Sequence, residues 1–156
     1  MSFWLIKSEP TSYSIDDLKR DRITAWTGVR NFQARNFIRE MKKGDEVFIY
    51  HSSCEITGIY GIGKITREAY GDPTALDPKD SHFDERSEKA QKEGKDPIWV
   101  CVDIEFVKKF DEPITLAEIK KDNILQGMKV TQTGQRLSVM PVTEKEWERV
   151  LSLKRL

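Results

Sequence analysis

The chain has 156 residues, of which 38% are hydrophobic and 33% are charged, with 26 basic and 26 acidic side chains. This length and composition predict one globular domain with a substantial core, and the zero net charge excludes a protein that binds polyanions through its overall charge. Two isolated cysteines exclude a disulfide scaffold, and the short apolar run at the start is too short for a signal peptide or membrane span, so we expect a cytoplasmic protein, or a nuclear one in a eukaryote.

The N-terminal segment predicts a strand followed by a short helix. Phe3 to Lys7 is a β-rich apolar run, which indicates a buried strand that presents Lys7 and Ser8 at its end. The spacing from Ser14 to Asp17 resembles a capping box with Asp in place of Glu, so a short helix should follow. Residues 23–26 then lead into the central segment.

The central segment, Trp26 to Ser52, combines a glycine turn, a helix and a strand. Apolar side chains at residues 34, 37, 38 and 41 recur at the spacing of one helical face. Asn31 is a suitable N-cap for this helix, and Gly28 permits a sharp entry into it. Alternation from Val47 onward predicts a strand. Polar groups therefore gather at both ends of a compact helix–strand unit, which is typical of a binding site.

A long strand is predicted from Thr57 to Glu68. It contains Gly58, Gly61 and Gly63, and glycines inside a strand indicate strong bending or the close approach of another backbone. Phosphate binding is disfavoured there, because no glycine-rich nucleotide motif is present. The bend therefore suggests a small barrel.

The segment from Gly71 to Pro97 loses the apolar pattern and is rich in acidic residues, lysines and prolines. A connection of this length is uncommon in a compact domain without a use, so it predicts either a lid or binding loop, or a solvated excursion without fixed structure. A strand over Ile98 to Phe110 follows it.

The remaining elements are two helices and a strand. Capping boxes at Thr115 and Thr143 predict the helices, and residues 137–142 predict the strand. Five or six strands with short helices predict an α+β domain around a small bent β-barrel. The few, irregularly placed helices disfavour an open doubly wound sheet.

Several motifs resemble one known family. They read Trp4-Leu-Ile-Lys-Ser-Glu-Pro10, Tyr13-Ser-Ile-Asp-Asp-Leu18, Trp26-Thr-Gly-Val-Arg-Asn-Phe-Gln-Ala-Arg-Asn36, Lys43-Gly-Asp45, Tyr50-His-Ser52, Arg67-Glu-Ala-Tyr-Gly-Asp-Pro-Thr-Ala75, Asp77-Pro78, Val107-Lys-Lys-Phe110 and Arg136-Leu-Ser-Val-Met-Pro-Val142. Together they resemble the EVE domain family and look like its single-domain bacterial form, with one domain over residues 1–156. Phe32 and Met140 stand where many members have Tyr and Gln.

The resemblance implies a PUA-like fold and a relationship to YTH and SRA domains, which read modified bases. It therefore implies a non-enzymatic reader of modified nucleobases in DNA or RNA. A base reader holds a planar ring against an aromatic wall and satisfies its edge with fixed polar groups. The predicted pocket residues are Ser8, Trp26, Gly28, Val29, Asn31, Tyr50, His51, Ser52 and Ser138, with Lys7, Arg30 and Arg35 as phosphate or polar contacts.

Each of these residues also has a structural interpretation. Trp26, like Trp4, Trp99 and Trp147, suits a core position, although we expect alanine at position 26 to abolish base binding and leave the fold largely intact. Asn31 suits a helix cap as well as a base contact. Arginine side chains such as Arg30 are most often solvated.

Two other functions compete with base reading. His51 and Cys54 could form the nucleophilic pair of an enzyme of RNA or nucleotide metabolism, although no orienting third group is visible. A free small ligand could also occupy the pocket without any polymer. Two histidines and two scattered cysteines do not form a metal-ligand set. We therefore expect no metal, no cofactor, no membrane contact and a monomeric chain.

Overall fold

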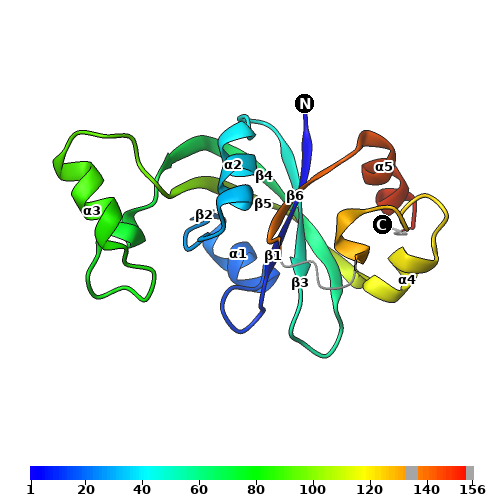
Figure 1. Ribbon diagram of the computed structural model, residues 1–156. Coiled ribbons are helices and arrows are strands. Elements are labelled where there is room, and N and C mark those ends of the chain that lie inside the picture. The colour runs from blue at the N-terminus through cyan, green and yellow to red at the C-terminus, as the bar shows by residue number, and fades with distance from the viewer. Residues whose placement is uncertain (133–136, 154–156) are drawn as a thin grey trace.

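The computed structural model describes residues 1–132 and 137–153 (Figure 1). Its elements in chain order are β1 (Phe3–Ser8), α1 (Ile15–Asp21), β2 (Ile23–Ala25), α2 (Phe32–Glu40), β3 (Glu46–His51), β4 (Gly58–Gly71), the 3-10 helix η1 (Pro73–Leu76), α3 (Glu85–Lys92), β5 (Val100–Thr115), α4 (Leu116–Lys121), the 3-10 helix η2 (Lys129–Thr131), β6 (Val139–Val142) and α5 (Glu144–Leu153). Within these residues, no helix is long and apolar enough to cross a membrane.

One six-stranded sheet has the order β2-β5-β4-β3-β1-β6. Only the β1–β3 pair is parallel, and the other neighbours run antiparallel. The long β4 and β5 strands extend away from the body on one side, while α4 and α5 lie on the other (Figure 1). The mixed α+β architecture agrees with the predicted PUA-like fold.

The sheet bends at the glycines within β4. A side chain at Gly58 would collide with the Ile114 carbonyl of β5, and one at Gly61 would collide with the Lys108 carbonyl. The β4–β5 register shifts at four places along the pair. The glycines thus serve the close approach of two backbones, as predicted, and they allow the sheet to curl.

The predicted helix starts are confirmed. Ser14 and Asp17 exchange both hydrogen bonds of a capping box at α1, and Thr115 and Glu118 do so at α4. The Asn31 side chain accepts a hydrogen bond from the backbone N–H of Ala34, which makes it the N-cap of α2. Local sequence therefore fixes where these helices begin.

The strand bounds differ from the prediction at several ends. β6 begins at Val139 rather than at residue 137, and β5 continues to Thr115. Pro141 lies within β6, which is tolerated because β6 is an edge strand and a ladder donor is not needed on its open side. Arg136, the first residue of the last matching motif, lies outside the described residues.

The segment between β4 and β5 is folded, which corrects the alternative of a solvated excursion without structure. We call residues 72–99 the arm. It contains η1 and α3, and Ala75, Ser87 and Ala90 are buried in it. The Trp99 indole N–H donates to Asp84 Oδ2 at 2.8 Å. This hydrogen bond connects the residue just before β5 to the residue just before α3. Trp99 is buried as predicted, but it packs in the arm and not in the main core.

Candidate nucleobase pocket

A cavity of about 460 Å³ lies where the two edges of the curled sheet meet. Lys7 and Ser8 enter it from β1, Thr24 and Ala25 from β2, and Ser138 from the residues before β6. Since β2 and β6 are the opposite edges of the sheet, only the bend brings these residues together. The remaining lining residues are Glu9, Ser12, Tyr13, Trp26, Thr27, Gly28, Val29, Arg30 and His82. The size is that of a small-ligand site.

Two aromatic side chains line this cavity. Trp26 follows β2 directly, and its backbone N–H continues the ladder by donating to the Val102 carbonyl at 2.8 Å. Tyr13 meets the Trp26 ring edge-on, with centroids 5.8 Å apart. Trp26 is only 8% exposed and belongs to the main core. Its removal should therefore destabilise the fold, which corrects the expectation that alanine at position 26 leaves the fold largely intact.

His51 is buried and contacts Ser8, which lines the cavity. The backbone N–H of Ile15 donates to His51 Nε2 at 3.1 Å, so Nε2 is an acceptor and the ring proton is on Nδ1. Nδ1 in turn lies 3.2 Å from both the Ser8 carbonyl and Ser8 Oγ, while Ser8 Oγ donates to the Tyr13 carbonyl at 2.7 Å. His51 thus orients Ser8 and joins β1, β3 and α1.

The burial of His51 predicts a pH dependence of stability. Burial lowers its pKa below 6.5 despite the opposing hydrogen bond to Ser8. A depressed histidine pKa means that protons bind the unfolded chain more readily, so this contribution is full above pH 6.5 and is lost as pH falls through the folded-state value. We expect the free energy of unfolding in urea to fall between pH 7 and 5, less steeply in His51→Gln. Parallel profiles for the two proteins would contradict this assignment.

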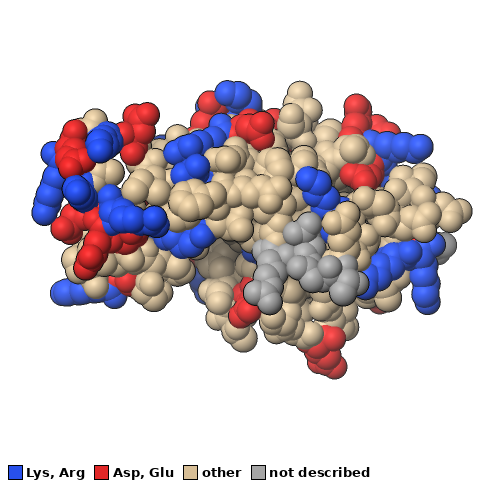
Figure 2. Space-filling view, in the orientation of Figure 1, with Lys and Arg blue, Asp and Glu red and all other residues tan. Residues whose placement is uncertain are grey.

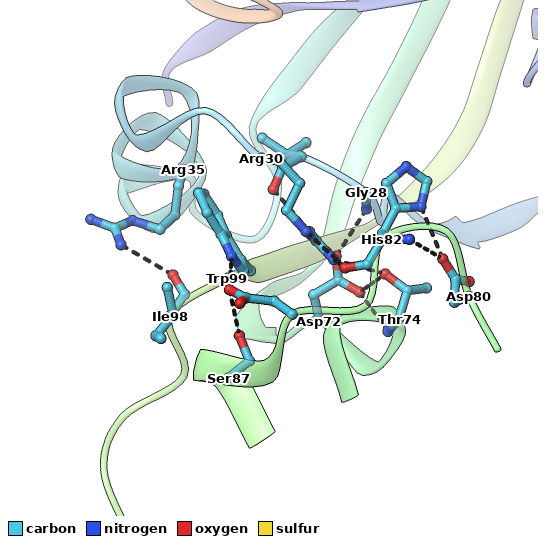
Figure 3. Close-up of polar contacts among 12 residues, drawn as sticks. Gly28, Arg30, Arg35, Asp72, Thr74, Asp80, His82, Ser87, Ile98 and Trp99 are labelled. Atoms are coloured by element: carbon cyan, nitrogen blue, oxygen red, sulfur yellow. Dashed lines mark hydrogen bonds and ion pairs between the residues drawn. The ribbon is translucent and has the colours of Figure 1, made fainter. Parts of the chain in front are cut away.

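A buried carboxylate anchors the turn that carries Gly28. Asp72 is 2% exposed, and its oxygens accept from the Gly28 backbone N–H at 2.9 Å and from the Thr74 backbone N–H at 2.8 Å (Figure 3). Burial alone would raise the pKa of Asp72, but the hydrogen bonds from Thr74, Gly28 and Arg30 outweigh it and hold the pKa below the ordinary value. The arm is therefore tied to the pocket by an ionised group.

Arg30 is the second tie between pocket and arm. Its guanidinium donates to the Val29 carbonyl, Asp72 Oδ2 and Thr74 Oγ1, and twice to the His82 carbonyl, at 2.8–3.2 Å. An arginine has five N–H donors, and these five bonds use all of them. The structure therefore corrects the predicted phosphate contact at Arg30, because no donor is left for a phosphate oxygen.

The structure places several other predicted residues outside the cavity lining. Asn31 is exposed and caps α2. Tyr50 is 2% exposed and lies under the Lys7 ammonium, and burial raises the Tyr50 pKa to about 12. The Ser52 backbone N–H donates to the Ser8 carbonyl at 3.3 Å. Arg35 donates to the Ile98 carbonyl at 3.1 Å, so it too contacts the arm.

Lys7 and Glu9 are the oppositely charged side chains at the β1 end of the cavity. The Lys7 ammonium is 5.8 Å from the centre of the Tyr50 ring, and burial lowers its pKa. The Lys7 backbone N–H donates to the Ser138 carbonyl at 2.8 Å, which brings Ser138 to the cavity. With Arg30 neutralised by Asp72, the lining has no large excess of either charge.

Sequence reasoning missed seven of the lining residues, which are Glu9, Ser12, Tyr13, Thr24, Ala25, Thr27 and His82. Tyr13 and Thr27 lie within two of the family motifs, so their motif membership was the available signal. His82 lies in the polar segment after β4, where no local pattern connects it to Gly28, 54 residues earlier in the chain. Only the folded arm brings these two residues together.

The geometry disfavours the predicted His51–Cys54 pair. Both ring nitrogens of His51 are occupied by groups from Ser8 and Ile15, and Cys54 Sγ donates to the Ile56 carbonyl at 3.2 Å. Across residues 1–132 and 137–153, no three His, Cys, Asp or Glu side chains are grouped closely enough to hold a metal ion.

The sequence model of the EVE domain family matches residues 2–153 of this chain. The chain belongs to the EVE domain family. Thymocyte nuclear protein 1 of Homo sapiens is 42% identical over 173 aligned residues, which cover 98% of this chain and 74% of that protein.

Solved EVE domain structures superpose closely on this one. A Pseudomonas syringae protein is 48% identical with a TM-score of 0.90, and the match covers 97% of this chain and 99% of the Pseudomonas syringae chain. The human THYN1 protein in complex with 5-methylcytosine-containing DNA is 41% identical with a TM-score of 0.88, and covers 100% and 99% of the two chains. The family and fold expected from the sequence motifs are therefore confirmed for this EVE domain.

Proposed function

We propose that this EVE domain is a non-enzymatic reader of modified nucleobases in DNA or RNA. The observation that carries the proposal is the cavity of about 460 Å³ between the two edges of the sheet. In this cavity, Trp26 and Tyr13 lie beside fixed polar groups from β1 and the Gly28 turn. Aromatic walls suit the faces of a planar ring, and hydroxyl, amide and ammonium groups suit its edge. A neutral base fits a lining that has no large excess of charge.

The polymer part of the proposal is supported by the human relative. A protein that is 41% identical over this whole chain was solved with 5-methylcytosine-containing DNA. A base inside a duplex can enter a cavity only by leaving the stack, at a cost of a few kcal/mol. We therefore propose that an extruded base fills the cavity while the neighbouring backbone stays on the surface.

The phosphate contacts are proposed for Lys7, which lines the cavity, and for Arg35 on α2. Figure 2 shows basic side chains over α2, and on the arm they alternate with acidic ones. A chain with zero net charge should have weak non-specific affinity. We therefore expect a shallow salt dependence, from few phosphate contacts, and an affinity that depends mainly on the base.

The proposal is tested with matched oligonucleotides. We expect a duplex with one 5-methylcytosine to bind more tightly than the same duplex with cytosine, and the free nucleoside to bind more weakly than either polymer. Fluorescence anisotropy at several salt concentrations measures both, and an RNA of the same sequence tests the second polymer. Equal affinity for modified and unmodified chains would overturn base reading. A nucleoside that binds as tightly as the duplex, without salt dependence, would instead support the free-ligand function.

A further inference from the structure

His82 reaches the pocket from the arm and rests on Gly28. The φ angle of Gly28 is +86°, and a side chain there would begin 2.9 Å from His82 Nε2. The Nε2 end of the imidazole therefore occupies the space that the glycine leaves free. The ring lines the same cavity as Trp26 and is 46% exposed, so a bound molecule can meet it.

The other side of His82 is fixed by the arm. Asp80 Oδ1 lies 3.0 Å from His82 Nδ1 and accepts from the His82 backbone N–H at 2.8 Å, while the His82 carbonyl accepts both bonds from Arg30 (Figure 3). The backbone N–H of His82, and then its ring, hold the pKa of Asp80 below the ordinary value, so Asp80 is an ionised acceptor. The ring thus has one settled orientation.

For the uncharged imidazole, this arrangement determines what Nε2 can offer. A carboxylate only accepts hydrogen bonds, so Nδ1 is the donor in the His82–Asp80 pair. An uncharged imidazole that donates from Nδ1 has a lone pair on Nε2. That atom can accept from an exocyclic amino group, as in cytosine or adenine, and it faces a carbonyl oxygen unfavourably.

We propose that His82 is a specificity-determining residue of the pocket, which accepts a hydrogen bond through Nε2 from the amino group of the bound base. The proposal rests on the proposed function and adds to it a chemical class, the amino-bearing bases. It also gives the arm a role, because the arm supplies the recognising atom while Arg30 and Asp72 hold the arm in place.

The test compares 5-methylcytosine with thymine. The two bases carry the same methyl group, and they differ in the 4-amino group against a 4-carbonyl and in the proton on N3. Each is placed opposite an abasic site in the same duplex, so that neither has a pairing partner. One net hydrogen bond is worth about 1 kcal/mol, so we expect the wild type to prefer 5-methylcytosine about fivefold.

Variants at position 82 separate recognition from folding. Arg30 donates to the backbone carbonyl of His82, and the backbone N–H of His82 donates to Asp80. Because both bonds use only the backbone of His82, His82→Ala should keep the arm docked. We expect its preference to fall to nearly one. His82→Gln, whose amide reaches the level of Nε2, should restore part of it, and the shorter His82→Asn should not. Lys79→Ala is the matched control on the arm and should keep the wild-type preference, because Lys79 is exposed, does not line the cavity and bonds to Asp77 only through its backbone N–H.

The outcomes distinguish the two proposals. If the wild type prefers 5-methylcytosine over cytosine but His82→Ala keeps the full preference over thymine, the His82 proposal fails and base reading stands. If the wild type binds 5-methylcytosine and thymine equally well, the His82 proposal likewise fails and base reading stands. If the wild type does not distinguish modified from unmodified duplex at all, the proposed function itself fails.

Discussion

Trp26→Ala should abolish detectable preference for a modified base and should also destabilise the protein. Stacking on an aromatic side chain is worth about 1–3 kcal/mol per base, so affinity should fall by roughly 5- to 150-fold. Because Trp26 is 8% exposed and packed in the core, its truncation should cost about 3–5 kcal/mol of unfolding free energy. Anisotropy and urea unfolding measure the two effects separately.

Trp147→Ala is the matched control for this substitution. Trp147 is 4% exposed and stacks on Phe48 with centroids 3.8 Å apart, and it does not line the cavity. It should lose comparable stability yet keep its affinity for the modified duplex, provided that both variants are measured at a temperature where they are folded. Equal losses of affinity in the two variants would mean that Trp26 acts only through the core.

Arg30→Ala should cause the largest loss of stability among the charged residues of the pocket. It removes the cationic partner of Asp72, whose side chain is fully buried, and leaves that carboxylate with hydrogen bonds from Gly28 and Thr74 but without its countercharge. Breaking a buried pair in this way costs about 3–5 kcal/mol. Chemical denaturation at neutral pH should report this loss, and hydrogen exchange should show the arm opening before the sheet does.

Arg20→Ala is the control for loss of an arginine. Arg20 pairs with Asp17 and Asp21 at similar distances, but its side chain is 67% exposed. Exposed pairs contribute little, so this variant should unfold like the wild type. An Arg30→Ala protein as stable as Arg20→Ala would show that the Arg30–Asp72 pair does not hold the arm.

Local patterns in the sequence predicted the elements and the capping well. Ser14, Asn31 and Thr115 each satisfy backbone donors within three residues, so their roles depend only on nearby sequence. Gly58 and Gly61 were also interpretable, because a glycine within a strand has few other uses. These predictions required no knowledge of which strands pair.

Long-range pairing determined what the sequence could not show. Arg30 is chemically suited to phosphate, but its partners Asp72, Thr74 and His82 come from the arm, 42 to 52 residues later in the chain. The arm itself has a polar sequence because its core is small and is completed by Trp99 stacked on Phe32 of α2. The partners of Arg30, rather than its residue type, decide whether its donors are available to a ligand.

The most direct test of base reading is to map the contact on the protein. An ¹⁵N-labelled chain is titrated with a duplex that contains one 5-methylcytosine and, separately, with the unmodified duplex. The proposed function predicts the largest modification-dependent shifts at the amides of Ser8, Gly28 and His82 and at the Trp26 indole. A second cavity of about 360 Å³, lined by Gln91, lies beside α3. The proposed function would be contradicted if the shifts gathered around this second cavity while the amides lining the cavity of about 460 Å³ stayed unchanged.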